Sequence, residues 1–261
     1  MEKTRKVLNI IALLAVLVVN TLAQTLPING VTPGDVSDRY PTLVTPAGYV
    51  FSIWSLIYIG LAGFIVYQAR RDTGSRPPVE RISYWFILSC ILNITWIFVW
   101  HHFLIGWSVV VMLALLVTLI SLYHRIRYGR ESRAIGEYWL VQVPFSLYLA
   151  WICVATIVNV TVFLKNSGWD GWGISSETWA VILLIFATGL ALTFSFIRKD
   201  VPFVLVFIWA FIGIGIEHGN VPLVRNTAWI LAGILGVYAV FLLFKALRDR
   251  KRWDQSYVHS Q

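Results

Sequence analysis

Charged side chains are scarce in this chain. Asp, Glu, Lys and Arg make up 13% of its 261 residues, and hydrophobic residues make up 58%. About a quarter of the residues of a soluble domain are charged, so this shortage excludes an ordinary soluble domain. Hydrophobic runs of about 20 residues cross a bilayer as helices. The composition therefore predicts an all-α, polytopic transmembrane helix bundle whose first partner is the lipid bilayer.

Reactive residues are few where the chain is most hydrophobic. The long apolar runs contain no Asp, Glu, Lys, Arg or His in their interiors, and proton relays and ion-coupled carriers need such groups at membrane depth. The two cysteines, Cys90 and Cys153, lie inside apolar runs, which argues against a disulfide framework. The sequence has no phosphate-binding loop, zinc-ligand spacing or nucleophile elbow. We therefore expect no metal site, no required cofactor and no enzymatic activity.

Apolar runs divide the chain into about eight candidate spans. Most of them reach the length of about 20 residues that a membrane helix needs, and the shortest is 201–216. The eight runs cover residues 7–23, 48–69, 82–100, 103–123, 138–164, 178–197, 201–216 and 226–244. The sequence therefore predicts an eight-span bundle.

Basic residues alternate between rich and poor segments along the chain. The net charge is +8, and 18 of the 21 Lys and Arg residues lie in the N-terminus, the C-terminus and every second connection, which leaves 3 for the other connections. Lys and Arg gather in the cytoplasmic loops of membrane proteins. The pattern thus predicts a multi-pass protein of the cell membrane with both termini in the cytoplasm. Because topology accounts for the basic charge, we expect no nucleic-acid partner.

The first apolar run has two readings. It is the first span, or it is a signal peptide, because Lys3 to Lys6, an apolar core and Thr21-Leu22-Ala23 fit a cleaved leader of residues 1–23. Asn20 and Pro27 are expected to end either kind of segment.

The longest segment on the outer side is residues 24–47. Its proline and glycine content predicts an ordered, turn-rich loop rather than a helix. Loops longer than about 15 residues are often lids or binding elements, and the alternative is a plain connector.

Tryptophan is abundant, with thirteen residues, and most of them fall at span ends, where membrane proteins place interfacial anchors. Trp169, Trp172 and Trp179 belong to that group. Trp54, Trp96 and Trp151 lie instead in span interiors, as does Trp209, to which the sequence assigns no role. A buried indole N–H needs a protein or ligand partner. The interior tryptophans are therefore where function is to be sought.

Helical spacing groups these tryptophans with other uncharged residues. Residues three or four apart share one helix face, so Tyr148, Trp151, Ala155 and Asn159 share a face in one span. Trp54 shares a face with Tyr58, and Asn93 shares one with Trp96. Together these faces predict an enclosure for a flat, largely apolar ligand, with Asn93 and Asn159 as hydrogen-bonding groups. The alternative is that the same residues only join helices together.

Four further features of the sequence are interpreted as structural rather than functional. Pro144 is expected to kink the entry of its helix, since proline lacks the backbone donor. His101-His102 predicts an interfacial turn rather than a metal site, and Glu217-His218 an exposed loop pair. Ala228, Ala232 and Gly236 share one helix face, which predicts close packing within the bundle or between subunits of a homo-oligomer.

The motifs around these residues resemble those of the TspO/MBR family, the tryptophan-rich sensory proteins related to the translocator protein. They occur in the family's order: Pro46 to Phe51 followed by Trp54-x-x-x-Tyr58, then Asn93-x-x-Trp96, then Ala150-Trp151-x-x-x-Ala155-Thr156-x-x-Asn159. The resemblance covers residues 5–165 and implies a five-helix bundle. Residues 166–261 would then add three further helices and a basic tail.

The resemblance also implies a ligand. Family members bind tetrapyrroles such as protoporphyrin in a pocket under the loop between the first two helices, which corresponds here to residues 24–47. By position, Trp54 and Trp151 look like the two pocket tryptophans and Ala155 like the small pocket residue. Tyr58, Asn93 and Trp96 look like lining or packing groups.

Three functions follow as hypotheses. The first is a sensor or translocator that binds a porphyrin-like or other hydrophobic small molecule between the second, third and fifth helices. The second is a small-solute transporter that uses the extra helices. The third is a structural or regulatory membrane subunit without a ligand.

Overall fold

The computed structural model describes residues 2–26, 28–69, 77–82, 84–127 and 135–258. Within these ranges every regular element is a helix, and each of the eight predicted runs coincides with a long helix. These long helices are α1 (Glu2–Thr25), α3 (Ile53–Ala69), α5 (Trp85–His101), α6 (Ile105–Arg127), α8 (Val143–Asn166), α9 (Ser176–Arg198), α10 (Val201–Glu217) and α11 (Pro222–Val258). The predicted all-α helix bundle is confirmed.

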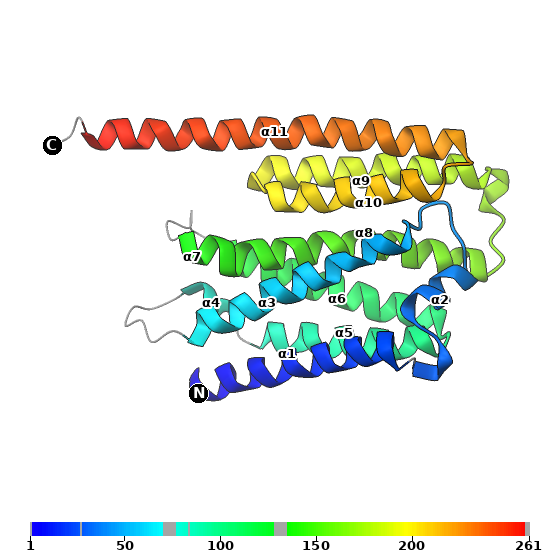
Figure 1. Cartoon of the computed structure of the whole chain (residues 1–261), viewed down its shortest axis with the longest axis horizontal. Coiled ribbons are helices and arrows are strands. Elements are labelled where there is room, and N and C mark those ends of the chain that lie inside the picture. The colour runs from blue at the N-terminus through cyan, green and yellow to red at the C-terminus, as the bar shows by residue number, and fades with distance from the viewer. Residues whose placement is uncertain (1, 27, 70–76, 83, 128–134, 259–261) are drawn as a thin grey trace.

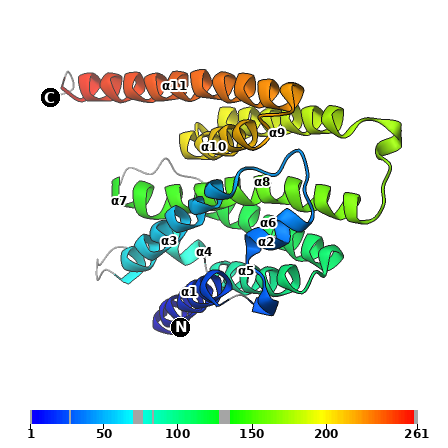
Figure 2. The ribbon, with the colours of Figure 1, turned by 45° about the vertical axis from the view of Figure 1, so that its right-hand side comes forward.

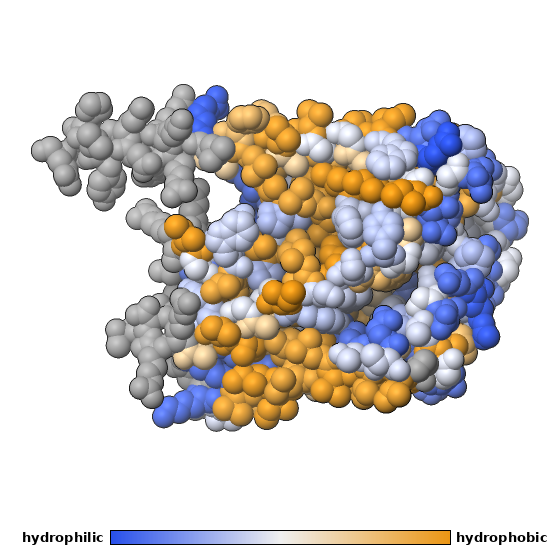
Figure 3. Space-filling model, in the orientation of Figure 1, coloured by the Kyte–Doolittle hydropathy of each residue, from blue (hydrophilic) through white to orange (hydrophobic). Residues whose placement is uncertain are grey.

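The long helices have the lengths and surface of membrane spans. Six of those described are long and apolar enough to cross a membrane, and α5 and α10 are shorter apolar helices of 17 residues each. At 1.5 Å per residue the short pair reach about 25 Å, close to the hydrocarbon core of about 30 Å. Figure 3 shows hydrophobic residues across the middle of one face and hydrophilic residues at the end that carries α2. The chain is thus a multi-pass membrane protein.

The helices form two groups that meet at α8 and α10. Helix α6 packs on α5 and α8, and α1 packs on α3 and α5, which gives a five-helix bundle. Helices α9, α10 and α11, here called the C-terminal extension, form a layer over α8 (Figures 1 and 2). Helix α10 joins the two groups because it packs on α8 as well as on α9 and α11. The division into domains at residue 165 stays a prediction.

The small-residue face of α11 is used inside the chain. Ala228 and Ala232 are buried, and α11 packs closely along α10. Gly215 of α10 lies so near the Trp229 ring that an added Cβ would come within 2.9 Å of Nε1. The structure thus shows packing within the chain for Ala228 and Ala232, whereas an added Cβ on Gly236 would meet nothing within 4 Å.

Both termini lie at the same end of the molecule, and residues 28–47 lie at the other (Figure 1). An even number of spans accounts for this. Of the predicted cytoplasmic basic residues, Arg70, Arg71, Arg76, Arg130 and Arg133 lie outside the described residues. Short helices α4 (Pro77–Ile82) and α7 (Ile135–Glu137) stand at the end of the termini.

A buried ion pair ties the bundle to the extension at this same end. Asp200 caps α10 by accepting a hydrogen bond from the Phe203 N–H at 3.3 Å. The same carboxylate accepts from the Tyr123 hydroxyl at 2.6 Å and lies 2.8 Å from the Arg127 guanidinium. Because Asp200 is fully buried, the pair links α6 to α10 with no competition from water.

Pro144 shapes the helix that carries most of the candidate residues. The chain winds as a π-helix, η3 (Tyr138–Gln142), directly before α8, in which Pro144 occupies the first turn. The irregular turn therefore precedes Pro144, and the kink expected from the proline itself stays a prediction. An added Cβ on Gly60 of α3 would lie 3.0 Å from the Pro144 ring, so the glycine lets α3 and α8 come close together and brings Trp54 next to Trp151.

Candidate functional site

An ordered segment of residues 28–47, here called the lid, covers the end of the bundle opposite the termini. It contains η1 (Ile28–Gly30) and α2 (Pro33–Arg39), and η2 (Gly48–Ser52) joins it to α3. The expectation of a loop without a helix is therefore wrong at α2. Pro33 begins this helix and Thr32 forms a reciprocal capping box with Asp35. The Thr32 backbone N–H and hydroxyl hold the pKa of the Asp35 carboxyl below its usual value.

The lid is fastened to α5 beneath it. The Trp100 indole N–H donates to the Pro33 carbonyl at 3.3 Å, and the Asn29 amide donates to the His101 carbonyl at 2.9 Å. The Arg39 guanidinium lies 4.4 Å from the centre of the Phe103 ring. His101 and His102 each direct Nδ1 to a backbone carbonyl of α5. His101 is the last residue of α5 and is buried, and His102 begins the turn that follows, so the expected interfacial turn is right for His102 and wrong for His101.

A hollow lies beneath the lid, between α1, α3, α5, α6 and α8. Its volume is about 190 Å³, which is smaller than the range of about 300–1,000 Å³ that ligand sites commonly span. Six of the eight candidate residues line it: Trp54, Asn93, Trp96, Trp151, Ala155 and Asn159. Tyr58 and Tyr148 lie behind this wall and pack against Trp54.

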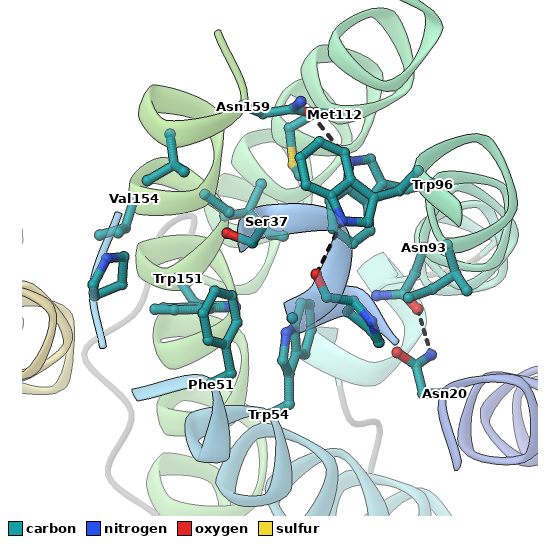
Figure 4. A pocket seen from close by; sticks show the side chains of 18 of the residues that line it. Asn20, Ser37, Phe51, Trp54, Asn93, Trp96, Met112, Trp151, Val154 and Asn159 are labelled. Carbon is teal, nitrogen blue, oxygen red and sulfur yellow. Dashed lines mark hydrogen bonds between the residues drawn. The ribbon is translucent and has the colours of Figure 1, made fainter. Parts of the chain in front are cut away.

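Aromatic rings form one wall of the hollow. The Trp54 and Trp151 rings meet edge to face with centres 6.3 Å apart, and Phe51 meets Trp151 in the same way at 5.8 Å. Tyr58 stacks on Trp54 at 5.4 Å. Figure 4 shows Phe51, Trp54 and Trp151 facing one another on one side of the pocket. The buried Trp151 indole N–H has no hydrogen-bond partner within the described chain, which is costly unless something else satisfies it.

Asn93 is a junction of three helices. Its Oδ1 accepts from the Asn20 amide of α1 at 2.9 Å, and its own amide nitrogen donates to the Tyr148 hydroxyl of α8 at 3.2 Å. Asn20 was expected to end the first helix, and this expectation is wrong. The helix continues to Thr25, and the Asn20 amide also donates to the Val16 carbonyl of the preceding turn.

Asn159 forms a second junction, next to Trp96 at the edge of the pocket (Figure 4). Its Oδ1 accepts from the Trp96 indole N–H at 3.2 Å, and its amide nitrogen donates to the Ser108 hydroxyl of α6 at 2.8 Å. Trp96 also stacks on Trp100 with ring centres 5.3 Å apart. Both asparagines therefore join helices, and both also line the hollow.

A family model described as TSPO-like protein matches residues 6–241. The chain belongs to this TSPO-like family. The match continues through α9, α10 and most of α11, and so runs past residues 5–165, which hold the sequence motifs. No curated protein and no solved structure matches the chain.

In this TSPO-like protein the extension also holds the end of the lid and η2, which follows it. The Trp209 indole N–H of α10 donates to the Val50 carbonyl at 3.0 Å, and its ring packs edge to face on Tyr49 at 5.3 Å. The Ala47 N–H donates to the Gly213 carbonyl at 3.3 Å. These contacts give Trp209 a position that the sequence did not supply.

His218 completes this contact between α10 and the lid. Its Nε2 lies 3.0 Å from the Thr45 carbonyl, and the residue is part-buried. The expectation of an exposed pair at Glu217-His218 is therefore right for Glu217 and wrong for His218. The lid therefore contacts α10, a helix outside the five-helix bundle.

Several lining residues were not among the candidates. Asn20, Met112, Leu115 and the lid residues Pro33 and Ser37 all line the hollow. Asn20 carried a signal, because a polar amide inside the first apolar run needs a partner. The apolar side chains of α6, Met112 and Leu115, gave no sequence signal that they line a pocket, since any helix of the bundle offers similar residues.

Proposed function

We propose that this TSPO-like protein binds a flat, largely apolar molecule of the porphyrin class in the hollow beneath the lid. The observation that carries the proposal is the convergence of Phe51, Trp54, Trp96 and Trp151 from four separate elements around one roofed hollow. Ring faces and edges of this kind favour a planar aromatic ligand. The hollow has a volume of about 190 Å³, less than such sites usually have, so the proposal requires the lid or the lining side chains to move outward when the ligand enters.

The polar groups of the hollow support an amphipathic ligand. The Trp151 N–H is buried without a partner, and a ligand acceptor would satisfy it. Asn93 and Asn159 each have two amide N–H groups, and one of each is used within the protein. Gln24, Thr32 and Ser37 line the hollow at or near the lid. Polar substituents such as porphyrin carboxylates would lie there.

A binding role without chemistry by the protein is part of the proposal. None of the described residues that line the hollow is acidic, basic or a histidine, and general acid–base catalysis relies mostly on such groups. We therefore propose a sensor or translocator that holds its hydrophobic ligand and releases it unchanged.

We also propose that the protein lies in the cell membrane with the termini on the cytoplasmic side. The distribution of Lys and Arg in the sequence supports this orientation. The lid and its hollow would then open on the outer side.

Trp54→Ala and Trp151→Ala should each weaken the binding of protoporphyrin by about tenfold or more. Truncating a buried tryptophan at a binding site commonly costs about 2 kcal/mol or more, and 1.4 kcal/mol is a factor of about ten. Binding is measured in detergent by the absorbance shift of the porphyrin, a readout that does not depend on the tryptophans. Trp107→Ala is the control, because Trp107 is 64% exposed on α6 and does not line the hollow. Unchanged affinity for protoporphyrin in both Trp54→Ala and Trp151→Ala would contradict the assignment of the pocket.

Ala155→Phe should block the same pocket without removing an aromatic wall. Ala155 lines the hollow one helical turn from Trp151 and one turn from Asn159, so a phenyl ring at this position takes up ligand space. We expect affinity for protoporphyrin to fall by about tenfold or more. Ala114→Phe places the same ring on the exposed face of α6 and should bind as the wild type does. Equal affinities in the two variants would contradict the proposed location.

A further inference from the structure

A second cavity lies at the same end of the molecule, outside the five-helix bundle. It is walled by residues 41–44 of the lid, the ends of α8 and α10, and the start of α9. Its volume is about 620 Å³, and it shares no lining residue with the first hollow. Cavities between two packed units of a protein are common ligand sites.

The connection between α8 and α9 builds one wall of this cavity from tryptophan. The rings of Trp169, Trp172 and Trp179 lie within 5.1 to 6.0 Å of one another, centre to centre. Trp169 and Trp179 line the cavity, and the Trp179 N–H donates to the Gly171 carbonyl at 2.9 Å. These rings were expected to act only as membrane anchors. They also form a fixed aromatic surface at the edge of a cavity.

The backbone that carries these rings is unusual. Trp172 has φ +55° between Gly171 at +69° and Gly173 at +75°, and the left-handed region is unfavourable for a bulky residue. The Asp170 carboxylate holds this turn, called η4 (Gly171–Gly173), by accepting from the Trp172 N–H at 2.8 Å. Strain of this kind persists where the surrounding structure enforces it, often at binding sites.

The charges that face the cavity favour a cation. Its ionisable lining residues are Lys165, Asp170, Glu217 and His218. Lys165 donates to the Pro41 carbonyl of the lid and His218 contacts the Thr45 carbonyl, so both already hold the lid. Within the described chain no hydrogen bond or ion pair engages the Glu217 carboxylate. It ends α10, where the negative pole of the helix disfavours an unpaired carboxylate.

We propose that this second cavity binds an organic cation with an apolar or aromatic body. The cationic group would lie between Glu217 and Asp170, with the indole rings of Trp169 and Trp179 beside it. Ammonium groups are attracted to the faces of tryptophan rings. The carboxylates of Asp170 and Glu217 supply two negative charges, and the one lysine of the lining, Lys165, is already bonded to the lid. The inference does not rest on the porphyrin pocket.

The test titrates benzyltrimethylammonium into the full-length protein in a maltoside detergent by calorimetry. We expect saturable binding by the wild type, and binding about tenfold weaker in Glu217→Gln and in Trp179→Leu. Glu177→Gln is the matched control, since Glu177 lies in the first turn of the same α9 helix but does not line the cavity. Benzyl alcohol, which has the ring without the charge, should bind far more weakly.

A second arm distinguishes a free cation from a lipid headgroup, which offers the same quaternary ammonium. Titration is repeated in nanodiscs of phosphatidylcholine and of phosphatidylglycerol. If benzyltrimethylammonium binds more weakly in phosphatidylcholine nanodiscs than in phosphatidylglycerol nanodiscs, the lipid headgroup is the occupant. If it binds with equal affinity in both, the occupant is a free cation. No saturable binding by the wild type would overturn the proposal, as would binding that Glu217→Gln leaves unchanged. Protoporphyrin affinity should be unaltered in Glu217→Gln, so this test and the porphyrin test fail independently.

Discussion

Gly213→Val should weaken the binding of protoporphyrin by tenfold or more, although Gly213 does not line the pocket. An added Cβ at this position would lie 2.2 Å from Cγ2 of Val50 and 3.2 Å from Cβ of Pro46. Val50 is fully buried, its branched side chain is stiff, and Pro46 is a ring. The end of the lid and η2 must therefore move, and together they carry Pro46, Gly48 and Phe51 of the pocket wall.

The same variant should also be less stable, by about 1–3 kcal/mol, since overpacking a buried contact has this effect. Gly213→Ala should lower both the porphyrin affinity and the stability, but by less than Gly213→Val does. Gly189→Ala is the control, because a Cβ on this α9 glycine meets nothing within 4 Å. Melting temperature and porphyrin affinity are measured on all three variants. If Gly213→Val binds as tightly as the wild type, the extension does not hold the lid.

Asp200→Ala should destabilise the whole protein by about 3–5 kcal/mol, because it leaves Arg127 as a nearly buried charge without its carboxylate. It also removes the cap of α10, worth about 1 kcal/mol. Asp200→Asn loses the charge and keeps one acceptor oxygen, which can accept from the Phe203 N–H of the cap or from the Tyr123 hydroxyl but not from both. Because part of the network is kept, we expect a smaller loss of stability than in Asp200→Ala. The readout is the melting temperature in detergent.

Two comparisons separate the ion pair from general damage. Asp38→Ala removes an exposed carboxylate of the lid and should melt like the wild type. The double variant Arg127→Met with Asp200→Leu removes both charges and should recover much of the stability, since replacing a whole buried pair by apolar residues is often neutral. A double variant no more stable than Asp200→Ala would show that packing, not an unpaired charge, accounts for the loss.

The sequence predicts the membrane spans well because hydrophobic length is a local property. The runs 201–216 and 226–244 became α10 and α11, although the first is short. The pocket faces were predictable for a similar reason, since Trp151, Ala155 and Asn159 share a face by helical geometry alone. The lid helix was missed because Pro33 and Gly34 suggest a turn, while the capping pair Thr32 and Asp35 gave the opposite signal.

Contacts between distant residues were not predictable. The bond from Asn20 to Asn93 joins residues 73 apart, and the bond from Trp209 to Val50 joins residues 159 apart. A single sequence shows that each of these polar groups needs a partner but does not say which group supplies it. The role of Gly213 depends entirely on such a contact, because its missing side chain matters only where Val50 approaches.

The most direct measurement of the central claim is an experimental structure of the full-length protein with protoporphyrin added. The account predicts density for a planar ring system between Trp54, Trp96 and Trp151, roofed by Pro33 of α2, with the carboxylates toward Thr32 and Ser37. Density confined to the lipid-facing surface or to the cavity beside Trp179, with the hollow beneath the lid empty, would contradict it.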